Sequence, residues 1–409
     1  MELKINSIIK AHTKVSYAVE SAGPRPYDID CAEGTNIVSY SPSAEEAFHE
    51  LQFEMLRSYP HSLAVKDSVI HYWKDYAELN YKNITLCDGS ISGLYLINRL
   101  FLEKGDHVLG YVPTFSDFVA DVAMHGCTFD FVTLKPENNY KFCPQDLLDK
   151  LNENHKLVYI DNPNNPTGQI IPLADIELIL EAAKKLGVAV IVDEAYGEYM
   201  PKENSAVSLF GKYDNLLVPK TFSKGFGLAG MRAGYILMPE SLNPYMTNIT
   251  NPYCMSELSR AVAAKTIRNE AFLDGLRADT ARLKRMILDY PWKNISAAET
   301  ADSVSITLLI HKNPDVDMAA EFAKFRIWVY SGCDFDTLTK NTCRFRVPAE
   351  KDMDRVMEAL KTIDGIDYTE TTVSPRDTVS FFPSLTNPFG YTIIGKDSFE
   401  EEAKWNRIF

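Results

Sequence analysis

The chain contains one glycine-rich turn whose side chains could hold a phosphorylated aldehyde. The turn runs from Thr221 to Tyr235 and places Lys224 next to Ser223, with Arg232 further along. A lysine amine condenses with an aldehyde to form a Schiff base, and hydroxyl and guanidinium donors can bind a phosphate dianion. This combination indicates pyridoxal phosphate. The competing interpretation is that Lys224 is an ordinary solvated lysine and that the glycines only shape a loop, so the rest of the chain must decide.

The composition narrows the classes of protein to consider. Of the 409 residues, 45% are hydrophobic and 24% are charged, which is enough for one large core and a second, smaller one. The formal net charge of −14 argues against a nucleic-acid partner. The N-terminus lacks a signal-peptide pattern and no stretch approaches the roughly 18 apolar residues of a membrane span, so we expect a cytoplasmic protein without a membrane partner. The seven cysteines form no CxxC pair and have no zinc spacing, which favours a reducing compartment and no bound metal.

Seven short β-rich runs separated by helical patterns predict an α/β fold. Their alternation implies βα units and a mostly parallel sheet with helices on both faces. One intervening helix is predicted between Pro172 and Gly187, because proline before a helix and glycine after it are its usual boundaries. The predicted strands are Ile84–Cys87, His107–Val112, Thr128–Leu134, Leu157–Ile160, Val188–Val192, Leu216–Val218 and Gly234–Met238.

A second, smaller α/β region is predicted after a charged helical stretch at Met255–Tyr290. We predict an N-terminal arm over residues 1–40, a large domain over 41–265, a small domain over 266–370 and a tail over 371–409. The tail is rich in aromatic residues, and we hypothesise that it covers the active-site entrance. The small domain is expected from the apolar runs Ser303–Ile310, Arg326–Tyr330 and Arg344–Val347, followed by the helical pattern Met353–Ile363.

Polar side chains follow several of the predicted strands. Asp193 and Tyr196 follow one strand, and Asn165 follows another within the turn formed by residues 161–168. Ligands of α/β sheets bind beyond the carboxyl ends of the strands, so these side chains are expected near the Lys224 turn. An anion such as Asp193 could keep a pyridine nitrogen protonated. Taken singly, Asp193 could equally cap a helix and the Asn165 segment could be only a turn.

The order of these motifs resembles that of fold-type I pyridoxal-phosphate enzymes of the class I/II aminotransferase group, in particular histidinol-phosphate aminotransferases and their relatives. The likeness runs from about residue 28 to residue 365. It implies a large domain of the aspartate aminotransferase type with a seven-stranded sheet, a smaller α/β domain, and pyridoxal 5'-phosphate as cofactor. The motifs, in chain order, are Asp88-Gly89-Ser90, Pro113-Thr114-Phe115, Asn165, Asp193 with Tyr196, and Ser223-Lys224 with Arg232.

The resemblance implies a role for each motif residue around the cofactor. Lys224 would form the Schiff base and later move the substrate proton, while Asp193 would pair with the pyridine nitrogen. Asn165 and Tyr196 would hydrogen-bond the phenolic oxygen. Phe115 would stack on the ring, with core packing as the alternative. The phosphate would be bound at a helix start and in the lysine turn, by Gly89, Ser90, Ile91, Thr221, Ser223 and Arg232.

Two arginines are candidates to bind the substrate carboxylate. A guanidinium binds a carboxylate through two parallel hydrogen bonds, which an ammonium does not. Arg344 and Arg346 are two residues apart and share a face of any regular strand, so alternation does not choose between them. The family register selects Arg344, with a surface ion pair as the alternative.

Two further segments are compared with the family pattern. Tyr59, before Pro60, matches a tyrosine that in relatives reaches the phosphate of the neighbouring subunit, which implies a homodimer. A buried core tyrosine is the alternative. Thr35 and Asn36 lie where relatives carry a loop beside the substrate, but the following Ile37-Val38 departs from that pattern.

The leading functional hypothesis is an aminotransferase that acts on an amino acid or an amino-alcohol phosphate. The same apparatus could serve a decarboxylase, a lyase or a cyclase of a biosynthetic pathway, because the fold does not fix the reaction. A third hypothesis is a regulatory module that binds pyridoxal phosphate without catalysis. Such modules are usually fused to a DNA-binding domain, for which the acidic charge and the short N-terminal segment of this chain are unsuited.

Overall fold

The structure is a computed structural model that describes residues 3–12 and 26–365. These residues belong to one compact unit, Met1–Ile366. The predicted tail over residues 371–409 lies outside the described residues, and so does the hypothesis that it covers the active-site entrance.

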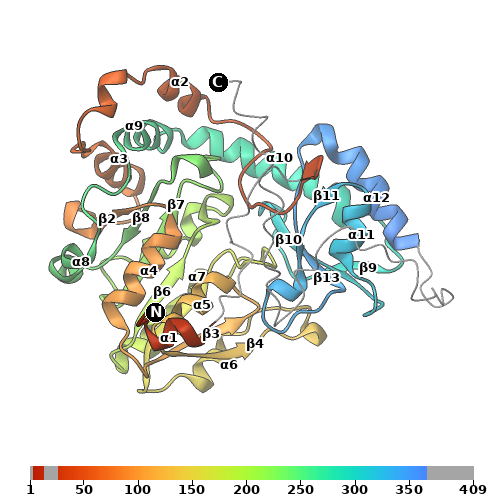
Figure 1. Cartoon of the computed structure of the whole chain (residues 1–409), viewed down its shortest axis with the longest axis horizontal. Coiled ribbons are helices and arrows are strands. Elements are labelled where there is room, and N and C mark those ends of the chain that lie inside the picture. The colour runs from red at the N-terminus through yellow and green to blue at the C-terminus, as the bar shows by residue number, and fades with distance from the viewer. Residues whose placement is uncertain (1–2, 13–25, 366–409) are drawn as a thin grey trace. The chain divides into compact units, whose positions relative to one another are not determined.

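A seven-stranded sheet forms the centre of the fold, in the order β2-β8-β7-β6-β5-β3-β4. Strand β8 runs antiparallel to its neighbours β2 and β7, and the other pairs are parallel. The predicted α/β fold with a mostly parallel sheet is therefore confirmed (Figure 1). The strands are β2 (Ile84–Cys87), β3 (His107–Val112), β4 (Thr128–Thr133), β5 (His155–Asp161), β6 (Ala189–Asp193), β7 (Leu216–Thr221) and β8 (Gly234–Leu237).

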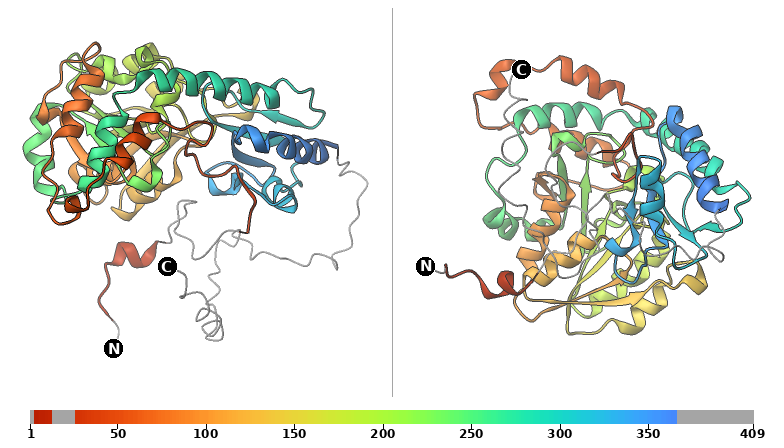
Figure 2. Two further views of the ribbon diagram at one scale, coloured as in Figure 1. Left: turned by 90° about the horizontal axis from the view of Figure 1, so that it is seen from above. Right: turned by 45° about the vertical axis from the view of Figure 1, so that its right-hand side comes forward.

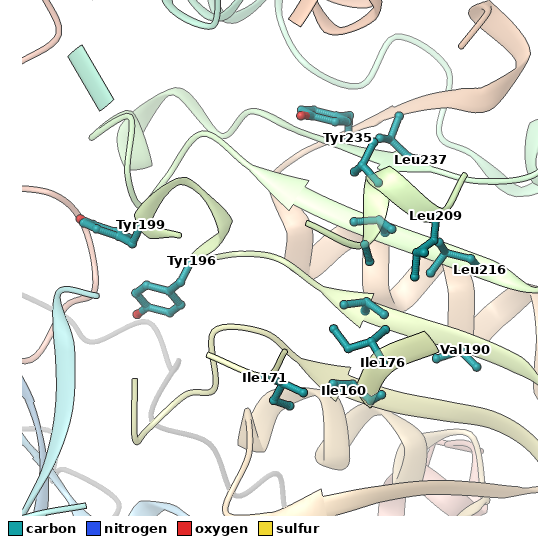
Figure 3. Close-up of a cluster of buried hydrophobic side chains, with 14 of the residues drawn as sticks. Ile160, Ile171, Ile176, Val190, Tyr196, Tyr199, Leu209, Leu216, Tyr235 and Leu237 are labelled. Carbon is teal, nitrogen blue, oxygen red and sulfur yellow. The ribbon is translucent and has the colours of Figure 1, made fainter. Parts of the chain in front are cut away.

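Both faces of this sheet are apolar, because helices cover both. Val190 and Leu216 of the sheet lie in one core cluster together with Ile176 of the predicted crossover helix α7 (Figure 3). Ile191 and Leu217 belong to a second cluster on the other face. The helices of the described residues are α1 (Ser7–Ala11), α2 (Pro42–His49), α3 (Ala64–Trp73), α4 (Ser90–Phe101), α5 (Ser116–Met124), α6 (Pro144–Lys150), α7 (Leu173–Lys185), α8 (Asn243–Ile249), α9 (Glu257–Thr266), α10 (Glu270–Leu288), α11 (Met318–Lys324) and α12 (Met353–Gly365).

A smaller antiparallel sheet follows α10, in the order β12-β13-β10-β9. Helices α11 and α12 lie side by side next to it (Figures 1 and 2). The N-terminal arm joins this part of the chain, because β1 pairs in parallel with β11. The exact domain boundaries stay a prediction. The strands are β1 (Ile29–Asp30), β9 (Ile295–Ala297), β10 (Ile306–His311), β11 (Ile327–Trp328), β12 (Tyr330–Ser331) and β13 (Thr342–Arg346).

Within residues 3–12 and 26–365, none of the helices is long and apolar enough to cross a membrane. All seven cysteines lie among the described residues, and each is a free thiol. The cytoplasm stays our prediction for the compartment.

Candidate active site

The lysine turn begins directly after β7 and closes on itself. The amide of Phe222 donates to the carbonyl of Ala233 at 3.0 Å, and the amide of Gly227 donates to the carbonyl of Lys224 at 3.0 Å. Gly227 has a φ of +71°, a conformation that favours glycine. The Lys224 Nζ lies 5.6 Å from the ring centroid of Tyr196. Tyr196 comes from the loop after β6 (Figure 3). The turn thus brings together two side chains that the sequence predicts to share a site.

The predicted phosphate-binding residues converge at the start of α4. Gly89 caps this helix with a φ of +86°, and a Cβ added there would lie 2.7 Å from Arg232 Nη2. Arg232 donates to the carbonyl of Asp88 at 2.8 Å and to Ser223 Oγ at 3.4 Å. The hydroxyl of Thr221 donates to Ser223 Oγ at 2.9 Å. We call Gly89, Ser90, Ile91, Thr221, Ser223 and Arg232 the phosphate cradle; Ser90 and Ile91 are the first two residues of α4.

Asp193 ends β6 and is almost completely buried, with 3% of its surface exposed. Its Oδ2 accepts a hydrogen bond from the Tyr159 hydroxyl at 3.0 Å, and its Oδ1 accepts one from the Ala195 amide at 3.1 Å. Burial, and after it the charge of Asp161, raise the pKa of Asp193 to about 7, although these two hydrogen bonds oppose the rise. A cationic neighbour would stabilise the ionised form of this buried carboxylate and lower its pKa again.

Asn165 and Tyr196 lie at the same edge of the sheet. The Asn165 amide donates to Asp161 Oδ2 at 2.8 Å. The buried hydroxyl of Tyr196 has no hydrogen-bond partner among residues 3–12 and 26–365. Gly34 packs so tightly against this hydroxyl that an added Cβ would overlap it. A buried hydroxyl without a partner is costly in a folded protein, so a polar group of a bound molecule is expected next to it.

The N-terminal arm contacts the lysine turn directly. The Thr35 hydroxyl donates to the carbonyl of Ser223 at 2.8 Å. The Asn36 amide donates to the carbonyl of Lys224 at 3.0 Å, and its side-chain Nδ2 donates to the carbonyl of Gly225 at 3.1 Å. Both side chains therefore support the turn. Their predicted contact with the substrate stays a prediction.

The two candidate arginines are both buried but have different neighbours. Arg344 donates to Asn165 Oδ1 at 3.0 Å and to the carbonyl of Ala32, and its guanidinium carbon lies 4.6 Å from the ring centroid of Tyr330. Arg346 donates to the carbonyl of Val347 at 3.2 Å and to that of Asp30, away from Asn165. The two arginines, which alternation along the strand does not distinguish, are thus distinguished by their neighbours in the structure.

Phe115 and Tyr59 are the remaining two predicted residues. Phe115 caps α5, just beyond β3, and packs against the second core cluster. Tyr59 is 69% exposed, and its ring stacks on Tyr253 with centroids 4.5 Å apart. Tyr59 is therefore not the buried core tyrosine that the sequence left open as an alternative. The role of each in cofactor binding stays a prediction.

The sequence reasoning missed a buried charge cluster behind the site. Lys220 Nζ lies 2.9 Å from Glu194 Oε2 and 3.5 Å from Glu198 Oε1, and all three side chains are at most 2% exposed. Although burial by itself lowers the pKa of Lys220, the two carboxylates raise it above its ordinary value. The sequence did contain a signal for this cluster: Glu194 and Glu198 flank Tyr196, and Lys220 lies in a largely apolar strand.

The fold and the site together define an enzyme class. The sequence matches the model of the family "Aminotransferase class I and II" over residues 30–289, and the chain belongs to this family. It is a pyridoxal phosphate-dependent aminotransferase, as the sequence predicted.

Particular relatives share much of the chain. It is 26% identical to the histidinol-phosphate aminotransferase of Methanocaldococcus jannaschii over 346 residues, which cover 83% of this chain and 91% of that protein. It is 32% identical to that of Ruminiclostridium cellulolyticum over 266 residues, 64% of this chain and 72% of that protein. The crystal structure of the Sinorhizobium meliloti histidinol-phosphate aminotransferase with pyridoxal-5'-phosphate is similar in fold, with a TM-score of 0.74, 20% identity, and coverage of 89% of this chain and 98% of that one.

The residues present fit pyridoxal phosphate at three points. The phosphate cradle offers hydroxyls, a guanidinium and a helix start to a dianion. Asp193 offers a buried acid whose raised pKa a ring cation would lower again. The hydroxyl of Tyr196 offers a buried donor to the phenolic oxygen.

Proposed function

We propose that this enzyme transfers the amino group of an amino-alcohol phosphate, histidinol phosphate in particular, to a 2-oxo acid. The observation that carries the proposal is the buried guanidinium of Arg344, which comes from the small sheet and lies 3.0 Å from Asn165 at the edge of the large sheet. A guanidinium binds a phosphate or a carboxylate equally well in two-pronged geometry. One residue could therefore serve the phosphate of the donor and the carboxylate of the acceptor.

Different residues would hold the different parts of the cofactor. The phosphate cradle would bind the dianion, and Asp193 would hold the proton of the ring nitrogen. Asn165 and Tyr196 would donate to the phenolic oxygen, and Phe115 would stack on the ring. When bound, pyridoxal phosphate supplies an electron-withdrawing ring that stabilises negative charge on the substrate carbon.

Lys224 would act twice in this proposal. Its Nζ would first hold the cofactor covalently. Once the substrate amine has displaced it, the Lys224 amine would take the proton from the substrate carbon and deliver it to the cofactor carbon. The Asn36 and Thr35 hydrogen bonds to the backbone of the lysine turn support this role, because they fix the base of a flexible side chain.

A half-reaction tests the proposal. Histidinol phosphate, added to the holoenzyme without an acceptor, should release one equivalent of the oxo product and leave the cofactor aminated, as followed by absorbance and mass spectrometry. Histidinol, which lacks the phosphate, should react with about 100-fold lower kcat/KM, because two charge-assisted hydrogen bonds are lost. Release of inorganic phosphate from histidinol phosphate, without amination of the cofactor, would instead support the lyase. Release of carbon dioxide from an amino acid in a parallel assay would support the decarboxylase.

We also propose a homodimer in which Tyr59 reaches the phosphate cradle of the partner. Several large apolar side chains of the same stretch are more than half exposed, which is unusual unless a partner covers them. Sedimentation at micromolar concentration should show a dimer. Tyr59→Phe should weaken cofactor binding but should not dissociate the dimer. The exposed residues are Phe48 at 62%, Phe53 at 73%, Leu56 at 60% and Tyr59 at 69%.

A further inference from the structure

Asp161 is a buried carboxylate at the end of β5 to which the proposed function assigns no role. It is 3% exposed. Its Oδ1 lies 2.7 Å from the Tyr111 hydroxyl and 3.0 Å from Asn164 Nδ2, and its Oδ2 accepts from the Asn165 amide at 2.8 Å. Burying a carboxylate costs solvation energy, which these hydrogen bonds offset.

The partners of Asp161 belong to the turn that presents Asn165. Asn164, held by Asp161 through Nδ2, also donates to the carbonyl of Pro113 at 3.2 Å and accepts from the Thr167 amide at 3.2 Å. The carboxylate therefore fixes the turn from inside. Asn165 Oδ1 in turn accepts from Arg344 Nη1 at 3.0 Å. A continuous set of hydrogen bonds leads from Asp161 to the anion-binding arginine.

Asp161 also lies beside Asp193, since the two are Cα partners in the parallel register of β5 and β6. The charged or titratable groups around this pair are Tyr111 on β3, Tyr159 on β5 and Glu194 after β6. The charge of Asp161 raises the pKa of Asp193. The same carboxylate that orders the turn thus also strengthens the hold of Asp193 on a proton.

We propose that Asp161 is a positioning residue of the transfer reaction, which holds Asn165 and through it Arg344 in place for the anionic end of the substrate. The proposal rests on the function proposed above, in which Arg344 binds that anion. Asp161 itself contacts neither substrate nor cofactor in this scheme. A side-chain amide cannot replace this carboxylate, because the partners at both of its oxygens include N–H donors, and an amide would turn its own N–H groups toward one of them.

The test measures binding of succinate to the holoenzyme, by the change in cofactor absorbance. Succinate has carboxylates for Arg344 but no amine, so it is not turned over. Asp161→Asn should raise the succinate dissociation constant about tenfold and raise KM for both substrates more than it lowers kcat. Tyr111→Phe, which removes one donor and preserves the shape, should raise the dissociation constant about threefold and remains informative if Asp161→Asn fails to fold.

Asp364→Asn is the matched control. Asp364 is a buried carboxylate that accepts from the amides of Lys293, Asn294 and Ile295, remote in sequence from the site. It should lower the unfolding temperature and leave succinate binding unchanged. Equal weakening by Asp364→Asn, or no weakening by Asp161→Asn and Tyr111→Phe, would overturn the positioning role. Undiminished succinate binding in Arg344→Lys would instead overturn the function proposed above, whatever Asp161 does.

Discussion

The two ends of the candidate cofactor site are built in opposite ways. The phosphate cradle depends on backbone geometry: a glycine with a φ of +86° at a helix start, and an arginine close to it. The other end, around Asp193, depends on buried carboxylates at the ends of neighbouring strands. One end can hold an anion and the other a cation, and Lys224 follows the strand next to that of Asp193. The sheet edge thus provides charge complementarity for a molecule that is negative at one side and positive at the other.

The strongest test of this comparison removes Lys224, which follows the strand next to that of Asp193. Lys224→Ala should abolish the absorbance of the lysine-linked cofactor and lower kcat by about 10³-fold or more, because both the attachment and the proton transfer are lost. The free energy of unfolding of the apoprotein should change little, since Lys224 is only partly buried. Lys212→Ala, at an exposed ion pair with Glu177, is the control and should behave as wild type. A normal absorbance spectrum in Lys224→Ala would mean that another lysine is the anchor.

The next largest effect is on KM, and comparing the two arginines of β13 shows which one binds the substrate anion. Arg344→Lys should raise KM for the anionic substrates by about 10- to 100-fold, as expected when a charge-assisted hydrogen bond of roughly 1.5–3 kcal/mol is lost. Arg346→Lys should lower the unfolding temperature and leave KM unchanged, because Arg346 contacts the carbonyls of Val347 and Asp30 and, at 3.5 Å, the Asp30 carboxylate. The reverse pattern in steady-state kinetics would place the anion at Arg346.

A pair of glycines sharpens the comparison at the phosphate cradle. Gly89→Ala should weaken cofactor binding about tenfold, or about 1.4 kcal/mol, because the new Cβ would lie 2.7 Å from Arg232 Nη2. Gly105 has a similar φ of +96° but open space around it. Gly105→Ala should therefore share the backbone strain and the loss of stability without the loss of affinity. Equal cofactor affinity of the two variants, by equilibrium dialysis, would show that Arg232 moves freely.

These contrasts also explain what the sequence could and could not reveal. The large sheet was predictable because strands buried on both faces, such as Val190–Val192, form uninterrupted apolar runs. The order of Asn165, Asp193 and Lys224 was readable because each follows such a run. The pairing of Asp161 with Asp193 was not, since it depends on a strand register between residues distant in the chain. The difference between Arg344 and Arg346 likewise depends on distant contacts, because Arg344 donates to Asn165 and Arg346 donates to Asp30 of the N-terminal arm.

The smallest expected effect concerns the proton at the Asp193 end, in the apoprotein. Folding raises the pKa of Asp193 from 3.8 to about 7, so the folded state binds more protons than the unfolded state between these values. Its contribution to stability is complete below the unfolded pKa and is lost as the pH rises through about 7. Urea unfolding should show this as a loss of about 1 kcal/mol between pH 6 and pH 7, which Asp193→Asn should abolish. The phosphate cradle contributes no such acid, so Ser223→Ala should retain the wild-type slope. Because a ring cation would lower the pKa of Asp193 again, the holoenzyme should lose the slope as well.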